Sequence, residues 1–176
     1  MSKRLIISAI APNQPGMASR ITQLIEQAGA CIEESHMTVM SNEFALIMEL
    51  SGPHNVLVRL EHQLPTQAQQ LGMLTTLKRS DKSNSAQPAT PYRVIVTKVD
   101  DRQTINRLTN FFAEHKINIE EINCRTLLAP HSEEMTGEIK MTITPSNDLL
   151  AEQIRTKFNQ LCTELKLSAE ISPLIT

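Results

Sequence analysis

The chain has 176 residues, which is enough for one large domain or two small domains that each enclose a core. Its formal net charge is −2, from 17 basic and 19 acidic residues, so it lacks the excess of Lys and Arg that a broad nucleic-acid footprint requires. Aromatic residues make up 3% of the chain and Trp is absent, which argues against surfaces that stack bases.

Hydropathy predicts neither a membrane span nor a secretory leader. No apolar run is long enough to cross a bilayer, and we expect no secretory leader at the N-terminus, where the apolar run is short and predicts a strand. Cys31, Cys124 and Cys162 are an odd number of cysteines without CxxC spacing, which favours reduced, buried thiols over disulfides or a zinc site. We therefore expect a cytoplasmic protein that needs no metal and no cofactor.

The first half of the chain predicts strand, helix, strand, strand, helix and strand. A β-branched run bounded by prolines predicts a buried strand over 5–10, and apolar residues at helical spacing from Met17 predict an amphipathic helix that ends at Gly29. This order is that of a ferredoxin-like βαββαβ unit, with two helices on one face of a four-stranded antiparallel sheet. The later elements are a strand over 31–40, a turn at 41–42, an alternating strand over 43–50, a helix from about 56 that ends near Pro65, and a strand over 73–78.

The second half repeats the first. A polar segment with prolines, residues 80–91, predicts a linker between a first domain over 1–79 and a second over 92–176. Ile32-Glu33-Glu34 recurs as Ile119-Glu120-Glu121, which indicates an internal duplication and hence an α+β fold of two tandem units. The repeated elements are a strand over 92–99, a helix with Ile105, Leu108, Phe111 and Phe112 on one face, strands over 117–124 and 138–144, a helix introduced by the N-cap residues of 145–148 and carrying Leu150, Ile154, Phe158, Leu161 and Leu165, and a strand over 167–171.

The segment that joins the first strand to the first helix is a candidate ligand site. Pro15 suits a helix start, Gly16 lets another group approach the backbone, and a helix N-terminus offers free N–H groups and a partial positive charge. Such a corner could receive a carboxylate, although a turn that merely connects two elements has the same sequence. The second repeat has 101–104 at this place, without Pro or Gly, so we expect the first repeat to bind better. Its longer acidic loop over 129–134 is either a contact surface or a solvated loop.

Enzyme motifs are missing from the sequence. It contains no Gly-x-Ser-x-Gly elbow, P-loop or Gly-x-Gly-x-x-Gly fingerprint, and its five histidines lack a tight metal-ligand pattern. Within each Ile-Glu-Glu the two glutamates are adjacent in a strand, so we expect them on opposite faces and not as an acid–base pair.

Two motifs resemble those of ACT domains. Asn13-Gln14-Pro15-Gly16 precedes the first helix, and Gly29-Ala30-Cys31-Ile32 opens the second strand. Asp101-Arg102 and Ile117-Asn118-Ile119-Glu120 resemble the same motifs in a weaker form. Over its full length the chain resembles the repressors of the glycine cleavage operon that consist of two tandem ACT domains.

This resemblance implies a regulatory protein and not an enzyme. Such repressors are thought to hold a LysR-type transcriptional activator instead of binding DNA, and glycine is thought to release that hold. The implied partners are therefore an amino acid and an activator protein, with a homodimer as a further option. A detached ACT regulatory subunit of an amino-acid metabolic enzyme is the alternative function that the same fold allows.

The resemblance also implies a ligand site shared by two ACT domains. An Asn in the first loop of one domain and an Asn that opens the second strand of its neighbour both reach the ligand in such proteins, and Cys31 cannot serve as the second of these. We therefore expect one composite site in which backbone N–H groups bind the carboxylate and amide oxygens bind the ammonium group. Its residues are Asn13, Gln14, Pro15, Gly16, Met17 and Ala18 from the first domain, and Asn118 and Ile119 from the second.

Overall fold

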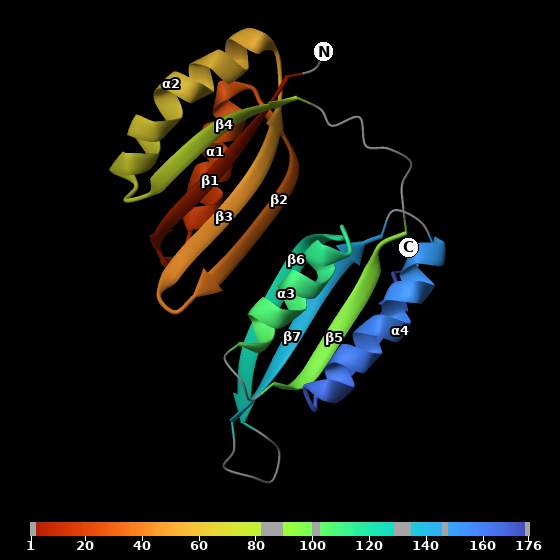
Figure 1. Ribbon diagram of the computed structural model, residues 1–176. Helices are drawn as coiled ribbons and strands as arrows, with labels where there is room; N and C mark the ends of the chain where they lie inside the picture. Colours follow the sequence, from red (N-terminus) through yellow and green to blue (C-terminus); the bar gives the residue numbers. More distant parts are fainter. Residues whose placement is uncertain (1–2, 82–89, 100–102, 129–134, 146–147, 175–176) are drawn as a thin grey trace. The chain divides into compact units, whose positions relative to one another are not determined.

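The protein folds into two compact units, Met1–Asn84 (unit 1) and Ser85–Thr176 (unit 2) (Figure 1). The computed structural model describes residues 3–81, 90–99, 103–128, 135–145 and 148–174. None of the described helices is both long and apolar enough to cross a membrane.

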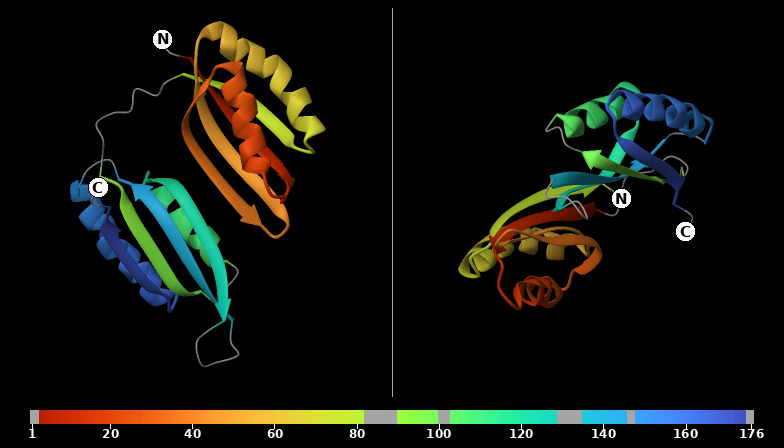
Figure 2. Two further views of the ribbon diagram at one scale, coloured as in Figure 1. Left: turned by 180° about the vertical axis from the view of Figure 1, so that it is seen from behind. Right: turned by 90° about the horizontal axis from the view of Figure 1, so that it is seen from below.

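Unit 1 has the predicted βαββαβ order. Its antiparallel sheet has the strand order β2-β3-β1-β4, so the first and third strands form its centre. Both helices cover the same face of the sheet, which leaves the other face without helices (Figures 1 and 2). The elements are β1 (Lys3–Pro12), α1 (Met17–Ala28), β2 (Cys31–Met40), β3 (Glu43–Ser51), α2 (His54–Gln70) and β4 (Leu74–Asp81).

Alternation along the strands separates the core of unit 1 from its open face. In β3, Phe44, Leu46, Met48 and Leu50 are buried under the helices, and the residues between them point to the helix-free side. Gly29 ends α1 in the left-handed conformation, as predicted, with φ +84°. β4 ends at Asp81, so the stretch predicted as a linker begins inside this strand, and residues 82–89 of it lie outside the described residues.

The prediction that α2 ends near Pro65 is wrong. The helix continues to Gln70 with Pro65 in its interior, although proline removes one backbone hydrogen bond there. Leu60, Leu64 and Ala68 lie four residues apart and are all buried against the sheet. The burial of apolar surface on both sides of Pro65 offsets the lost hydrogen bond.

Unit 2 repeats the architecture of unit 1. Its sheet has the strand order β6-β7-β5-β8, and both of its helices lie on one face (Figure 2). Phe112 and Phe158 are fully buried, with ring centroids 5.2 Å apart, and Phe111 packs against both. Ile105, predicted on the buried side of its helix, is exposed at the edge of that stripe. The elements are β5 (Tyr92–Val99), α3 (Thr104–Glu114), β6 (Asn118–Leu128), β7 (Met135–Thr144), α4 (Asp148–Glu164) and β8 (Ser168–Pro173).

Two short predictions fall outside the described residues: the N-cap chemistry at 146–147 and the acidic loop at 129–134. The cysteine prediction is partly wrong. All three thiols are free, but Cys31 and Cys124 are exposed because they lie on the edge strands β2 and β6. Cys162 is buried, and that burial raises the pKa of its thiol to about 11, which keeps it protonated at neutral pH.

The repeated Ile-Glu-Glu sequence forms a β-bulge in both units. In β2 the register shifts between Ile32 and Glu34, and in β6 it shifts between Ile119 and Glu121. The extra residue reverses the alternation of side chains, so Glu33 and Glu34 share the open face of the sheet, contrary to our expectation. Each bulged glutamate accepts a hydrogen bond from a hydroxyl at the end of the adjacent strand: Glu33 from Ser51, and Glu120 from Thr144.

An ion pair joins α2 to β4 and makes unit 1 sensitive to acid. Arg79 donates to both carboxylate oxygens of Glu61, from Nε at 2.5 Å and from Nη2 at 2.6 Å. This hydrogen bonding holds the pKa of Glu61 below its ordinary value of 4.5, against the opposing effect of burial. A carboxyl with a lowered folded-state pKa stabilises the fold above its unfolded-state pKa, and that stabilisation is lost as pH falls through the folded-state pKa.

Glu61→Gln is therefore expected to lower the free energy of unfolding at neutral pH. Below about pH 4.5, the free energy of unfolding of the variant should fall less steeply with pH than that of the wild type. Urea unfolding followed by circular dichroism from pH 7 to pH 3 measures both effects. Glu152→Gln is the matched control, since Glu152 is 72% exposed and lies 3.8 Å from Arg155. If the free energy of unfolding of Glu61→Gln falls with pH as steeply as that of the wild type, this pair does not cause the acid sensitivity.

Candidate functional site

The corner between β1 and α1 is built by the backbone. The N–H of Asn13 donates to the carbonyl oxygen of Asn42 at 2.8 Å, which ties the end of β1 to the β2–β3 turn. Gly16 has φ +88° and turns the chain into the helix, and its carbonyl oxygen accepts from the N–H of Arg20 at 2.9 Å. A left-handed residue at this place favours glycine.

The first turn of α1 has the electrostatics of a site for an anion. It contains no acidic residue, and no side chain caps it. The N–H of Met17 donates to the carbonyl oxygen of Gln14 at 3.3 Å, and the N–H groups that follow in the first turn, those of Ala18 and Ser19, are the orphan donors of a helix start. Ser19 was not among the predicted site residues, because sequence alone does not show which amides of a first turn are already bonded.

The predicted residues of unit 1 divide into two groups. Asn13, Gln14, Pro15 and Gly16 are exposed, and a Cβ built on Gly16 meets no atom within 4 Å, so the space above it is open. The side chain of Met17 is 3% exposed and belongs to the core, and Ala18 packs against the same core. A ligand at this corner would therefore meet the side chains of Asn13 and Gln14 and only the backbone of the last two residues.

Asn118 and Ile119 open strand β6 of unit 2. Asn118 is exposed and pairs with Thr144, and Ile119 packs against the second core. The contribution of these two residues to a site in unit 1 stays a prediction.

The corresponding corner of unit 2 has a different backbone. β5 bulges at Lys98, which has φ +63°, and Val99 then pairs with Gly137 of β7. The residue before α3 is Gln103, whose φ of −84° is right-handed where Gly16 is left-handed. Residues 101 and 102 lie outside the described residues. The described part of this corner thus lacks the open glycine turn of unit 1.

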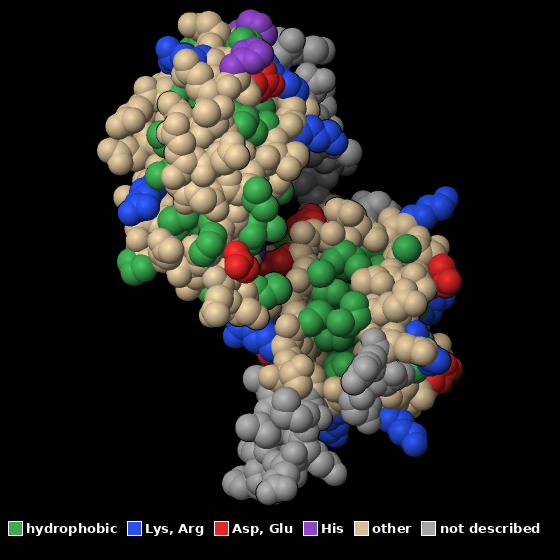
Figure 3. All heavy atoms as spheres, turned by 90° about the vertical axis from the view of Figure 1, so that its left-hand side faces the viewer, with side chains coloured by type: hydrophobic (Ala, Val, Ile, Leu, Met, Phe, Trp, Pro, Cys, Tyr) green, Lys and Arg blue, Asp and Glu red, His purple; other side chains and the backbone are tan. Residues whose placement is uncertain are grey.

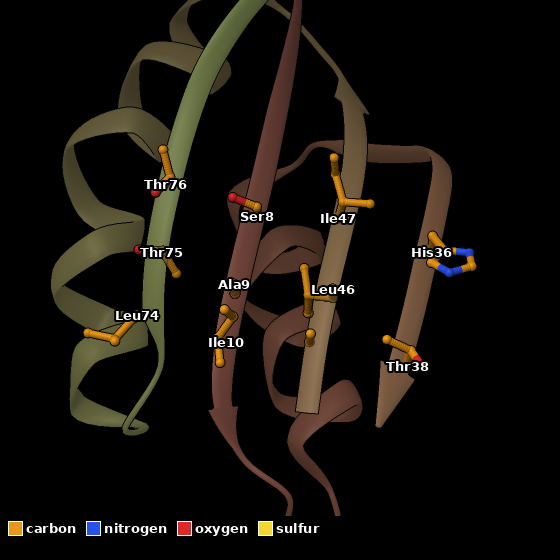
Figure 4. Close-up of a pocket in the computed structure, with 11 residues that line it drawn as sticks. Ser8, Ala9, Ile10, His36, Thr38, Leu46, Ile47, Leu74, Thr75 and Thr76 are labelled. Carbon is orange, nitrogen blue, oxygen red and sulfur yellow. The ribbon is translucent and has the colours of Figure 1, made fainter. Parts of the chain in front are cut away.

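A hollow of about 390 Å³ lies on the helix-free face of the unit 1 sheet (Figure 4). Its floor and rim combine apolar side chains with hydroxyl groups, and His36 is its one titratable lining residue. A free amino acid needs partners for two opposite charges, so this hollow is poorly suited to hold one. Its lining residues are Ser8, Ala9, Ile10, His36, Thr38, Ala45, Leu46, Ile47, Leu74, Thr75 and Thr76.

Neither a metal centre among the described residues nor a broad basic surface on the side drawn in Figure 3 stands out. In the described part of the chain, no three or more His, Cys, Asp or Glu side chains come together in a way that could hold a metal ion. On the side of the molecule drawn in Figure 3, Lys and Arg are scattered among acidic and apolar residues.

Comparison with known proteins places the chain in a family. The ACT domain family matches residues 3–78, which lie in unit 1. The chain is also 32% identical over 171 residues to the glycine cleavage system transcriptional repressors of Escherichia coli (strain K12) and Shigella flexneri, a match that covers 96% of this chain and 88% of each relative. The chain belongs to the family of glycine cleavage system transcriptional repressors. It is therefore a regulatory ACT protein and not an enzyme.

Solved structures agree with the tandem ACT fold of this repressor family. A crystal structure described as that of a glycine cleavage system transcriptional repressor has a TM-score of 0.77 and 25% identity, and the match covers 100% of this chain and 99% of that one. A protein of unknown function from Galdieria sulphuraria has a TM-score of 0.79 at 18% identity, covers 99% of this chain and 100% of that one, and shares the fold.

Proposed function

We propose that this repressor senses an amino acid, with glycine as the ligand, and that it acts by holding a LysR-type activator of the glycine cleavage operon. Its membership of the repressor family carries this proposal. The composition supports a protein partner over DNA, because 17 basic residues are balanced by 19 acidic ones.

We place the ligand at the corner formed by Asn13, Gln14 and Gly16. An amino-acid carboxylate would accept from the uncapped N–H groups of α1, and the amide oxygens of Asn13 and Gln14 would accept from the ammonium group. The exposed position of these side chains and the open space above Gly16 leave room for a small ligand. Asn118 would complete the site if unit 2 supplies the second asparagine, as the sequence predicted.

The size of glycine limits its affinity. The best small ligands gain about 1.5 kcal/mol per non-hydrogen atom, so the five such atoms of glycine give at most about 7.5 kcal/mol. This corresponds to a dissociation constant no tighter than roughly 1–10 μM. Such a site would respond to glycine at metabolic concentrations and release it readily.

Asn13→Ala is expected to weaken glycine binding about tenfold or more, because it removes a hydrogen bond to a charged group. The backbone bond from residue 13 to Asn42 survives the change, so the corner should keep its shape. Isothermal titration of glycine into the full chain measures the effect. Asn110→Ala, at an exposed asparagine on α3, is the matched control, and Asn118→Ala tests the predicted second wall.

If Asn13→Ala and Asn118→Ala both leave the affinity for glycine unchanged, the proposed site is wrong. Co-purification of the full chain from its own cells tests the partner. Capture of a LysR-type regulator that glycine releases supports the proposal, whereas capture of a catalytic subunit would favour the alternative of a regulatory subunit.

A further inference from the structure

The two units differ in the chemistry of their helix-free sheet faces. In unit 1, Ile10 of β1 pairs with Ala45 of β3 and with Leu74 of β4, and all three side chains point away from the helices. Ile10 is 52% exposed, Leu74 is 77% exposed, and Ile47 in the next row is 50% exposed. Exposed apolar side chains gathered on one face mark a contact surface more often than scattered ones do.

Unit 2 has polar residues at the positions of these apolar side chains. By strand register, Thr97 corresponds to Ile10, because it pairs with Glu138 of β7 and Ser168 of β8. Glu138 and Lys140 thus stand where unit 1 has Ala45 and Ile47, and Ser168 stands where it has Leu74. Both units fold into the same sheet, so the fold itself does not require the apolar residues of unit 1.

The charges on this face of unit 1 are arranged with opposite signs at its two edges. One row across the sheet consists of Glu34 on β2, Glu49 on β3, Ile6 on β1 and Lys78 on β4. Glu49 is paired with Arg4 of its own unit. Glu34 and Lys78 are exposed, and neither takes part in an ion pair among the described residues of the chain. This row therefore carries one negative charge without an ion-pair partner among the described residues at one edge and one such positive charge at the other.

We propose that the helix-free face of unit 1 packs against the same face of a second copy of this chain. A two-fold axis that lies in the interface along the strands reverses the strand order of the second copy. This operation places Glu34 opposite Lys78 of the second copy, and it does so twice in the dimer. It also places Ala45 opposite Ile10 and brings the protruding Leu74 over Thr38, on the rim of the hollow.

The size of the face sets the strength of such a dimer. Four strands about 4.8 Å apart and three rows of outward residues cover roughly 400 Å² per copy. This is below the roughly 800 Å² per partner of a standard interface, so the dimer should be weak and reversible. Ile47 lies on β3, one of the two central strands beside the axis, where a new charge would come close to the same charge of the second copy.

Sedimentation equilibrium of the full chain tests the proposal. Ile47→Lys, which installs the residue of unit 2, is expected to abolish dimerisation, since two lysines would meet near the axis. The matched control Thr142→Lys adds the same charge to the open face of unit 2 and should leave the dimer intact. Circular dichroism checks that both variants remain folded.

Charge reversal tests the geometry of the dimer. Glu34→Lys and Lys78→Glu are each expected to raise the dissociation constant about tenfold, and the double variant should restore it, because each reversed charge then faces the opposite reversed charge. A wild-type chain that stays monomeric throughout the micromolar range would overturn the proposal, as would an Ile47→Lys variant that still dimerises. Failure of the double variant to recover would overturn the two-fold arrangement along the strands.

Discussion

Phe158→Ala is expected to destabilise unit 2 by about 3–5 kcal/mol and to leave unit 1 folded. The Phe158 ring is fully buried, stacks on Phe112 with centroids 5.2 Å apart, and lies 5.5 Å from Phe111. Its removal opens a cavity beside the rings of Phe111 and Phe112 and removes both aromatic contacts. Small domains have a total stability of roughly 5–15 kcal/mol, so the loss is a large part of what unit 2 possesses.

The chain offers a natural probe for this prediction. It contains one tyrosine and no tryptophan, and Tyr92 lies in β5 of unit 2, so tyrosine fluorescence reports the unfolding of that unit alone. In Phe158→Ala the urea unfolding transition seen by tyrosine fluorescence should move to much lower urea concentration. Circular dichroism should also show a second transition, that of unit 1, at the wild-type urea concentration. Phe44→Ala in the core of unit 1 is the matched control, and it should leave the fluorescence transition unchanged. Equal shifts of that transition in both variants would mean that the two units unfold together.

Periodicity predicted most of this fold because each unit is simple. Phe44, Leu46, Met48 and Leu50 alternate without a break, and their burial followed directly from that alternation. The errors arose where tertiary packing overrides a local rule. Pro65 continues a helix because Leu64 and Ala68 are buried on either side of it, and the Ile-Glu-Glu bulges reverse an alternation that the sequence alone cannot show.

The candidate site was predictable only in its backbone. Pro15 and Gly16 indicated the turn before α1. In the structure Gly16 has the left-handed conformation that this turn needs. The burial of Met17 followed from the apolar stripe of its helix. The sequence did not show which amides of the first turn are already bonded, such as that of Met17, which donates to the carbonyl oxygen of Gln14. The apolar face of unit 1 was missed because it combines residues from four strands. Its sequence signal is the pair Ala45 and Ile47 on the outward side of β3, where β7 has Glu138 and Lys140.

Gly137→Ala is expected to destabilise unit 2 by about 1–3 kcal/mol through steric overlap. A Cβ at Gly137 would lie 2.8 Å from the Cβ of Val99 and 2.9 Å from its carbonyl oxygen. Both contacts come from the bulge at Lys98 that makes the end of β5 differ from the end of β1. For a domain of this size, each kcal/mol lowers the melting temperature by roughly 4–8 °C, so the tyrosine fluorescence transition should move measurably.

Gly72 separates steric overlap from backbone strain. It has φ +75°, and a Cβ added there would meet no atom within 4 Å, so Gly72→Ala acts through the left-handed backbone and Gly72→Asn should be milder, because asparagine tolerates that conformation. At Gly137 asparagine should destabilise the unit more than alanine does, because atoms of Val99 already fill the space that a side chain would need. Val99→Ala should not rescue Gly137→Ala, because the Cβ and the carbonyl oxygen of residue 99 remain in place. Two outcomes would contradict this explanation: rescue of Gly137→Ala by Val99→Ala, or an asparagine variant that is more stable than the alanine variant at both glycines. Either would show that the bulge relaxes and that close packing does not require glycine at 137.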